Sequence, residues 1–166
     1  MRKILLLSAA LLVVDWAVAQ ERTPSPQGAE VDIISPADGA TVASPLRVRF
    51  GLKGMGIAPA GIAFENSGHH HLLIDVDPPK DLAQPVPTDA NHVHFGKGQT
   101  ETELQLAPGK HTLQLLLGDH LHVPHSPPVL SKKITITVSG PATSAPAEGV
   151  PGKSAPAAGA DKPASG

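Results

Sequence analysis

The sequence contains no cysteine, and only 2% of its 166 residues are aromatic. Without thiolate sulfur the chain can form no disulfide, zinc finger, blue-copper centre or iron–sulfur cluster. The ligands of any metal site must therefore be the side chains of His, Asp, Glu or Met, or backbone oxygen. The lack of tyrosine and the single tryptophan also argue against sugar binding by stacking and against an aromatic-rich protein interface.

Positive charge is scarce as well. The chain has 13 lysines and arginines against 15 acidic residues, which gives a formal net charge of −2. A nucleic-acid partner would favour a strongly basic face, so we expect no nucleic-acid binding. The 18 prolines are too frequent for long helices, and no long stretch of the sequence shows helical periodicity.

The N-terminal end has the three parts of a secretory signal peptide. Arg2 and Lys3 give a positive start, an apolar run follows, and Ala17–Ala19 provides small residues before a cleavage site. The apolar run is shorter than the ~20 residues that cross a bilayer. We therefore predict a signal peptide at 1–19, a periplasmic protein that begins near Gln20, and no membrane span in the mature chain.

Composition divides the rest of the chain into three parts. Residues 20–29 are polar with two prolines and suggest a linker, whereas residues 30–139 hold nearly all the large apolar residues. Residues 140–166 are almost entirely Ala, Pro, Gly and Ser, and such a segment buries too little apolar surface to fold. We predict one domain at 30–139, followed by a disordered tail.

The predicted domain is patterned as a series of short strands. Apolar and polar residues alternate with period two in several segments, and Gly, Pro and Asp mark turns between them. The expected strands are residues 31–34, 46–52, 72–76, 101–106, 111–117 and 133–138. Pro108-Gly109 suggests a hairpin turn between the fourth and fifth of these strands. The pattern predicts an all-β fold, a small immunoglobulin-like β-sandwich.

All nine histidines lie between positions 69 and 125, and most of them stand in groups. Residues i and i+2 of a strand point to the same face about 6–7 Å apart. Two imidazoles at that spacing can reach one metal ion. Pairs with this spacing occur at 69/71, 92/94 and 120/122, and the candidate ligands are His69, His71, His92, His94, His122 and His125.

Two other histidines have a structural interpretation. His70 shares the strand parity of Leu72 and Ile74, which predicts a buried, hydrogen-bonded side chain. His111 stands alone in a predicted strand and is expected to support the fold. Met55 offers a thioether between two glycines, but its isolation favours an incidental position.

Imidazole ligands suit copper, zinc, nickel and iron, and copper(II) has the greatest affinity in the divalent series. We therefore rank copper first as the bound ion and zinc second. The function that the sequence favours is a periplasmic histidine-rich metal-binding module that acts in storage, delivery or protection, without catalysis.

The histidine motifs also resemble a known family of exported bacterial proteins, catalogued as domain of unknown function 4399. The similar segments are Gly68–Asp75 (GHHHLLID), His92–Glu101 (HVHFGKGQTE), Pro108–Leu113, and Leu117–Asp119 with His122, Pro124 and His125. The resemblance covers roughly residues 31–138. It implies a secreted single-domain module with no established reaction, and it places the histidine motifs at the centre of the family pattern.

Two alternatives remain open at this stage. The chain could be a structural or interaction module of the cell envelope, with an envelope protein as partner and the histidines forming a hydrogen-bond network. It could also be a cupin-like metal-dependent enzyme, since His92, His94, Glu101 and His111 partly match the ligand pattern of cupins. The spacing from His94 to Glu101 and the form of the Pro108-Gly109 turn depart from that pattern.

Overall fold

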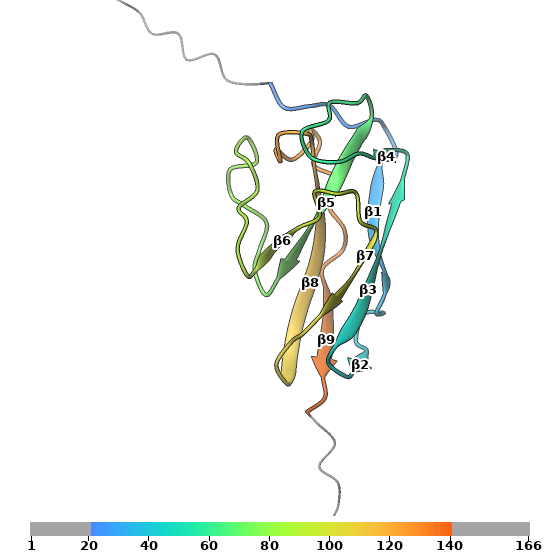
Figure 1. Cartoon of the computed structure of the whole chain (residues 1–166), viewed down its shortest axis with the longest axis vertical. Helices are drawn as coiled ribbons and strands as arrows, with labels where there is room; N and C mark the ends of the chain where they lie inside the picture. The colour runs from blue at the N-terminus through green and yellow to red at the C-terminus, as the bar shows by residue number, and fades with distance from the viewer. Residues whose placement is uncertain (1–20, 141–166) are drawn as a thin grey trace, which may run out of the picture.

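A computed structural model describes residues 21–140, which form two β-sheets packed face to face (Figure 1). The predicted signal peptide and the predicted tail from 141 onward lie outside the described residues. In the described part of the chain no helix has the length and hydropathy to cross a membrane.

One sheet has three antiparallel strands and the other has six strands. The first sheet follows the order β1 (Glu30–Ser35), β3 (Leu46–Lys53) and β7 (Glu101–Leu104). The second follows the order β2 (Thr41–Val42), β9 (Ile134–Val138), β8 (Gly109–Gly118), β5 (Ser67–Ile74) and β4 (Gly56–Ile57), and β6 (His92–His94) also pairs with β5.

Alternation along the strands produces the core between the sheets. In β3, Leu46, Val48 and Phe50 are buried, whereas the intervening Arg47 and Arg49 are exposed. The same cluster of buried residues includes Val31 and Leu104 of the first sheet and Leu72, Ile74, Leu113, Leu115, Leu117, Ile134, Ile136 and Val138 of the second. One apolar core thus joins both layers, and the predicted all-β sandwich is confirmed.

The predicted hairpin at Pro108-Gly109 is wrong. β7 pairs with β3 in the first sheet, whereas β8 pairs with β5 and β9 in the second. The turn therefore carries the chain from one layer to the other. The two segments have the alternation and the turn residues of a hairpin, but such signals do not specify which strand each segment will hydrogen-bond.

β5 is buried on both faces along its whole length. Its inner face contributes to the core between the sheets. On its outer face, Leu73 forms a second, smaller apolar cluster with Leu116 and Val86, and Val76 packs against this cluster. Val86 belongs to the long connection between β5 and β6, so this connection covers part of the outer face.

His70 lies on the inner face of β5, as its parity predicts. Its side chain is only 1% exposed, its ring packs on Phe50 with centroids 5.1 Å apart, and Nδ1 lies 3.2 Å from the carbonyl oxygen of Gln99. Met55 likewise packs against the apolar core. The prediction of a buried, hydrogen-bonded His70 is confirmed, and this histidine belongs to the core.

His111 links the end of β5 to the start of β8. Its Nδ1 lies 2.7 Å from Asp75 Oδ2 and its Nε2 lies 2.9 Å from the carbonyl oxygen of Ala107. Two acceptors facing both ring nitrogens favour the imidazolium form, and the hydrogen bond to Asp75 is the main reason that the pKa of His111 is raised. The structural interpretation of His111 is confirmed.

We expect the contribution of this pair to stability to depend on pH. Because the pKa of His111 is raised above its ordinary 6.5 in the folded state, the stabilisation is complete below pH 6.5 and is lost as pH rises through the folded-state value. Urea unfolding of wild type and Asp75→Asn at about pH 5.5 and about pH 8.5 measures this effect. Asn tolerates the positive φ of 59° at this position, so the variant alters the charge and not the backbone. A difference in stability that is equal at both pH values would contradict the ion pair.

Candidate metal centre

Strand register brings three histidines together on the outer face of β5. His69 and His71 are two residues apart in this strand, so they point to the same side. In the antiparallel pairing of β5 with β6, His94 lies directly opposite His71. Directly opposite residues of an antiparallel pair share a face. The three imidazoles therefore meet on the side of the second sheet that faces away from the core.

The ligand atoms of His69, His71 and His94 all lie within 4.8 Å of one another. For a zinc-like ion bound at 2.0–2.1 Å in tetrahedral geometry, ligand nitrogens are roughly 3.3 Å apart. Ring movements of about 1 Å would close this difference, and rotation about side-chain bonds is sufficient for them. The triad can thus hold a single metal ion without a change of the backbone.

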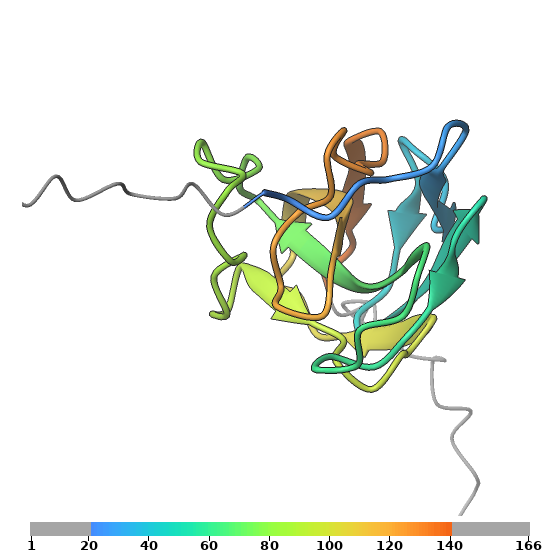
Figure 2. The same ribbon diagram turned by 90° about the horizontal axis from the view of Figure 1, so that it is seen from above.

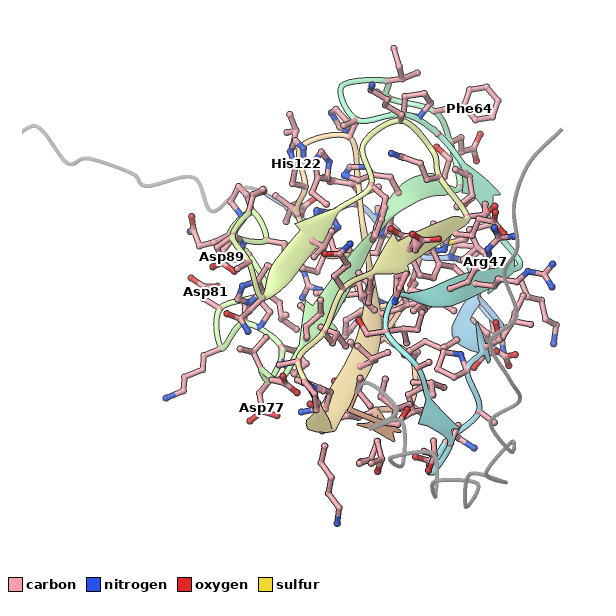
Figure 3. The ribbon with its side chains drawn as sticks, turned by 60° about the horizontal axis from the view of Figure 1, so that its bottom comes forward. Arg47, Phe64, Asp77, Asp81, Asp89 and His122 are labelled. Carbon is pink, nitrogen blue, oxygen red and sulfur yellow. The ribbon has the colours of Figure 1, made fainter. Side chains whose placement is uncertain are left out.

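His122 adds a fourth imidazole from the loop that follows β8. Its ring centroid lies 5.0 Å from that of His69, 4.7 Å from that of His94 and 6.0 Å from that of His71. His122 has a positive φ of 68°, which is uncommon for a residue other than glycine and is found disproportionately at functional sites. In Figure 3 it lies near β6, at the end of the domain that also carries Phe64.

Two glycines make room for the rings. Gly118 lies opposite His69 in the register of β5 and β8, and a Cβ atom at Gly118 would lie 2.6 Å from Cε1 of His71. A Cβ atom at Gly96 would lie 2.3 Å from Cε1 and 2.6 Å from Nε2 of His94. Any side chain at either position would occupy the space that an imidazole now fills.

The ring nitrogens of the cluster are buried without hydrogen bonds. His69 and His71 are 0% exposed. Among residues 21–140, both ring nitrogens of each of these histidines and Nε2 of His94 have no hydrogen-bond partner. A buried polar atom without a partner costs about 1–3 kcal/mol. Several such atoms in one place indicate a site whose nitrogens are reserved for a ligand.

The cluster is held in the neutral form. Burial, reinforced by the neighbouring imidazoles, lowers the pKa of His71 to about 3. Burial and the nearby His94 and His122 lower the pKa of His69 to about 4. Burial and the nearby His122 also lower the pKa of His94. Neutral imidazole is the form that binds metal ions. At neutral pH these three side chains therefore present lone pairs and no positive charge.

The remaining candidate ligands lie outside this cluster. His92 lies opposite Leu73, two pairs further along the strands, and its Nδ1 contacts Asp89 Oδ1 at 2.9 Å. His125 is fully buried, with Nε2 3.2 Å from the carbonyl oxygen of Ser67 and Nδ1 3.5 Å from that of Leu117. The structure thus brings together His69, His71, His94 and His122, and it does not bring His92 or His125 to them.

The residues of the cupin-like pattern are also separated. Glu101 is in β7 of the first sheet, where its carboxylate lies 3.8 Å from Arg47 and 3.9 Å from Arg49. His111 contacts Asp75. These two residues take part in ion pairs away from the histidine cluster.

Comparisons with known proteins place the chain in a family. The model of a family described as a domain of unknown function, DUF4399, matches residues 48–139, which is more than half of the chain. The chain therefore belongs to this family, as the histidine motifs predicted.

No curated protein sequence matches the chain. A solved structure described as fibronectin(III)-like modules of Clostridium thermocellum CbhA aligns over 66% of this chain and 95% of that chain, with 16% identity and a TM-score of 0.31. A score this low adds nothing to the fold described above.

Proposed function

We propose that this protein is a periplasmic, non-catalytic module that binds one transition-metal ion through His69, His71, His94 and His122. The ion that we rank first is copper. The observation that carries the proposal is the cluster of His69, His71 and His94, whose ligand atoms lie within 4.8 Å of one another and whose buried ring nitrogens lack hydrogen bonds within the described residues. A bound cation would supply a partner to one ring nitrogen of each of these histidines at once. Storage, delivery and protection are the roles that suit such a site.

The donor set supports copper over other ions. Four imidazoles without thiolate or carboxylate form a nitrogen-only site, and copper(II) binds such sites more tightly than zinc or nickel. Zinc, which accepts tetrahedral imidazole sites, is the second choice. Calcium and magnesium prefer oxygen ligands and do not fit.

The division among the histidines disfavours a hydrogen-bond network as the purpose of the cluster. His70, His92, His111 and His125 each have a hydrogen-bond partner and lie outside it. Within the described region, His69 and His71 have none. A structural network would show the opposite distribution, with its most buried members the best satisfied.

Calorimetric titration of the mature chain, prepared without a histidine tag, tests this proposal. We expect one equivalent of copper(II) to bind with a dissociation constant below about 1 μM, and zinc to bind more weakly. Copper at 100 times the dissociation constant should raise the free energy of unfolding by about 2.7 kcal/mol.

His94→Ala should remove most of the affinity, whereas His92→Ala, in the same strand but outside the cluster, is the matched control and should retain it. Absence of binding tighter than micromolar, or equal binding by the two variants, would contradict the proposal.

A further inference from the structure

The loop that carries His122 is built around one buried carboxylate. Asp119 is 4% exposed, and it follows directly on the last residue of β8. Its Oδ1 accepts hydrogen bonds from the backbone N–H groups of Leu121 at 2.8 Å and Val123 at 3.0 Å. Its Oδ2 accepts a hydrogen bond of 2.6 Å from the hydroxyl of Thr23. Both oxygens are thus used by the loop and by the N-terminal segment.

The backbone of the loop closes on the same residue. The N–H of His122 donates to the carbonyl oxygen of Asp119 at 2.9 Å, and the N–H of Asp119 donates to that of Val123 at 2.9 Å. Between these bonds His122 adopts its positive φ of 68°. A non-glycine residue keeps such a conformation only where its surroundings determine it. The bonds to Asp119 provide that constraint.

The N-terminal segment holds the loop from outside. Thr23 and Ser25 exchange backbone hydrogen bonds with Ser126, and Arg22 donates from its side chain to the carbonyl oxygens of Pro124 and His125. Figure 2 shows this segment, in blue, running beside the loop after β8, in orange. Residues 22–25 therefore act as a strap across residues 124–126, and Thr23 extends the strap to Asp119.

We propose that Asp119 is a positioning residue that presents His122 to the ion held by His69, His71 and His94. The proposal rests on the metal-binding function proposed above. Asp119 acts through the loop: its oxygens accept three hydrogen bonds from the loop and the N-terminal segment, and it is not among the residues whose ligand atoms gather at the cluster. Three ligands come from strands whose register fixes them, and the fourth comes from a loop that needs Asp119 to fix it.

Copper titrations of Asp119→Ala, His122→Ala and the double variant test the coupling. Losing a residue that orients a ligand typically reduces metal affinity 10–100-fold. We expect Asp119→Ala and His122→Ala to fall in this range, and the double variant to bind within about twofold of His122→Ala alone. Electron paramagnetic resonance of the copper(II) form should show one nitrogen donor fewer in Asp119→Ala than in wild type.

Asp119→Asn is the conservative variant. Its amide oxygen can accept from Leu121 and Val123, and its NH₂ can donate to the Thr23 hydroxyl, so it should restore affinity and donor number. If Asp119→Ala does not fold, Thr23→Val replaces it in the same double-mutant comparison. We then expect a smaller loss of copper affinity when Thr23→Val is made in wild type, and no further loss when it is made in the His122→Ala variant.

Additive losses, an unchanged donor number, or no rescue by Asp119→Asn would overturn the positioning role. Failure of wild type to bind copper would instead overturn the metal-binding function itself.

Discussion

Replacing His71 by leucine will abolish tight copper binding and, at the same time, stabilise the metal-free protein. Both ring nitrogens of His71 are buried without partners among the described residues, and the side chain is 0% exposed. Leucine has a similar volume and no polar atoms to leave unsatisfied. Since an unsatisfied buried group costs about 1–3 kcal/mol, we expect the metal-free variant to gain about 1–2 kcal/mol. Urea unfolding with chelator, beside copper titration, measures both effects.

His125→Leu is the matched control for this prediction. His125 is equally buried, but its ring nitrogens face the carbonyl oxygens of Ser67 and Leu117. Removing the ring removes its hydrogen bonding to those carbonyl oxygens, so the metal-free protein should lose stability. The sign of the change thus separates a ligand histidine from a structural one. If His71→Leu destabilises the metal-free protein as His125→Leu does, the cluster is structural.

The second large effect concerns the glycines that make room for the rings. Gly118→Ala places a Cβ atom 2.6 Å from Cε1 of His71, whose side chain is 0% exposed. The clash would force this buried ring away from its place beside His69 and His94, so we expect copper binding to be lost together with about 1–3 kcal/mol of stability. Copper titration and urea unfolding are the measurements.

Gly96→Ala provides the comparison. Its Cβ atom would lie 2.3 Å from Cε1 of His94, but this ring is only partly buried and can turn outward. We expect the same loss of copper binding with little loss of stability. If both alanine variants bind copper as wild type does, the imidazoles do not need their present positions and the proposed site is refuted.

The sequence predicts the ingredients of the site better than their arrangement. Parity alone places His69 and His71 on one face and His70 on the other, because β5 is a regular strand through the whole run. Parity cannot choose between His92 and His94, since both lie on the same face of β6. Register decides, and it sets His94 against His71 and His92 against Leu73. Register depends on long-range pairing that no local pattern contains.

The conformation of the loop after β8 could not be predicted from the local sequence pattern, for a different reason. The 120/122 pair has the spacing of a strand pair, but these residues form a turn fixed by Asp119, and only His122 meets the cluster. Asp119 belongs to the segment Leu117–Asp119 that carries the family resemblance, but the resemblance does not indicate its hydrogen bonds. An Asp at the start of a loop typically accepts a hydrogen bond from the backbone N–H two residues further on, which forms an Asx turn. Asp119 at the end of β8 fits this pattern, and this is the sequence signal that points to it.

The strap formed by residues 22–25 affects how short a fragment of this protein can be. The family match begins at Val48, within β3, yet Val31 of β1 lies in the core and Thr23 binds the Asp119 carboxylate, which we propose positions His122. A piece cut at Val48 would lack one strand of the three-stranded sheet and the outer support of the loop. The shortest piece that keeps both the fold and the proposed ion site therefore begins no later than Arg22.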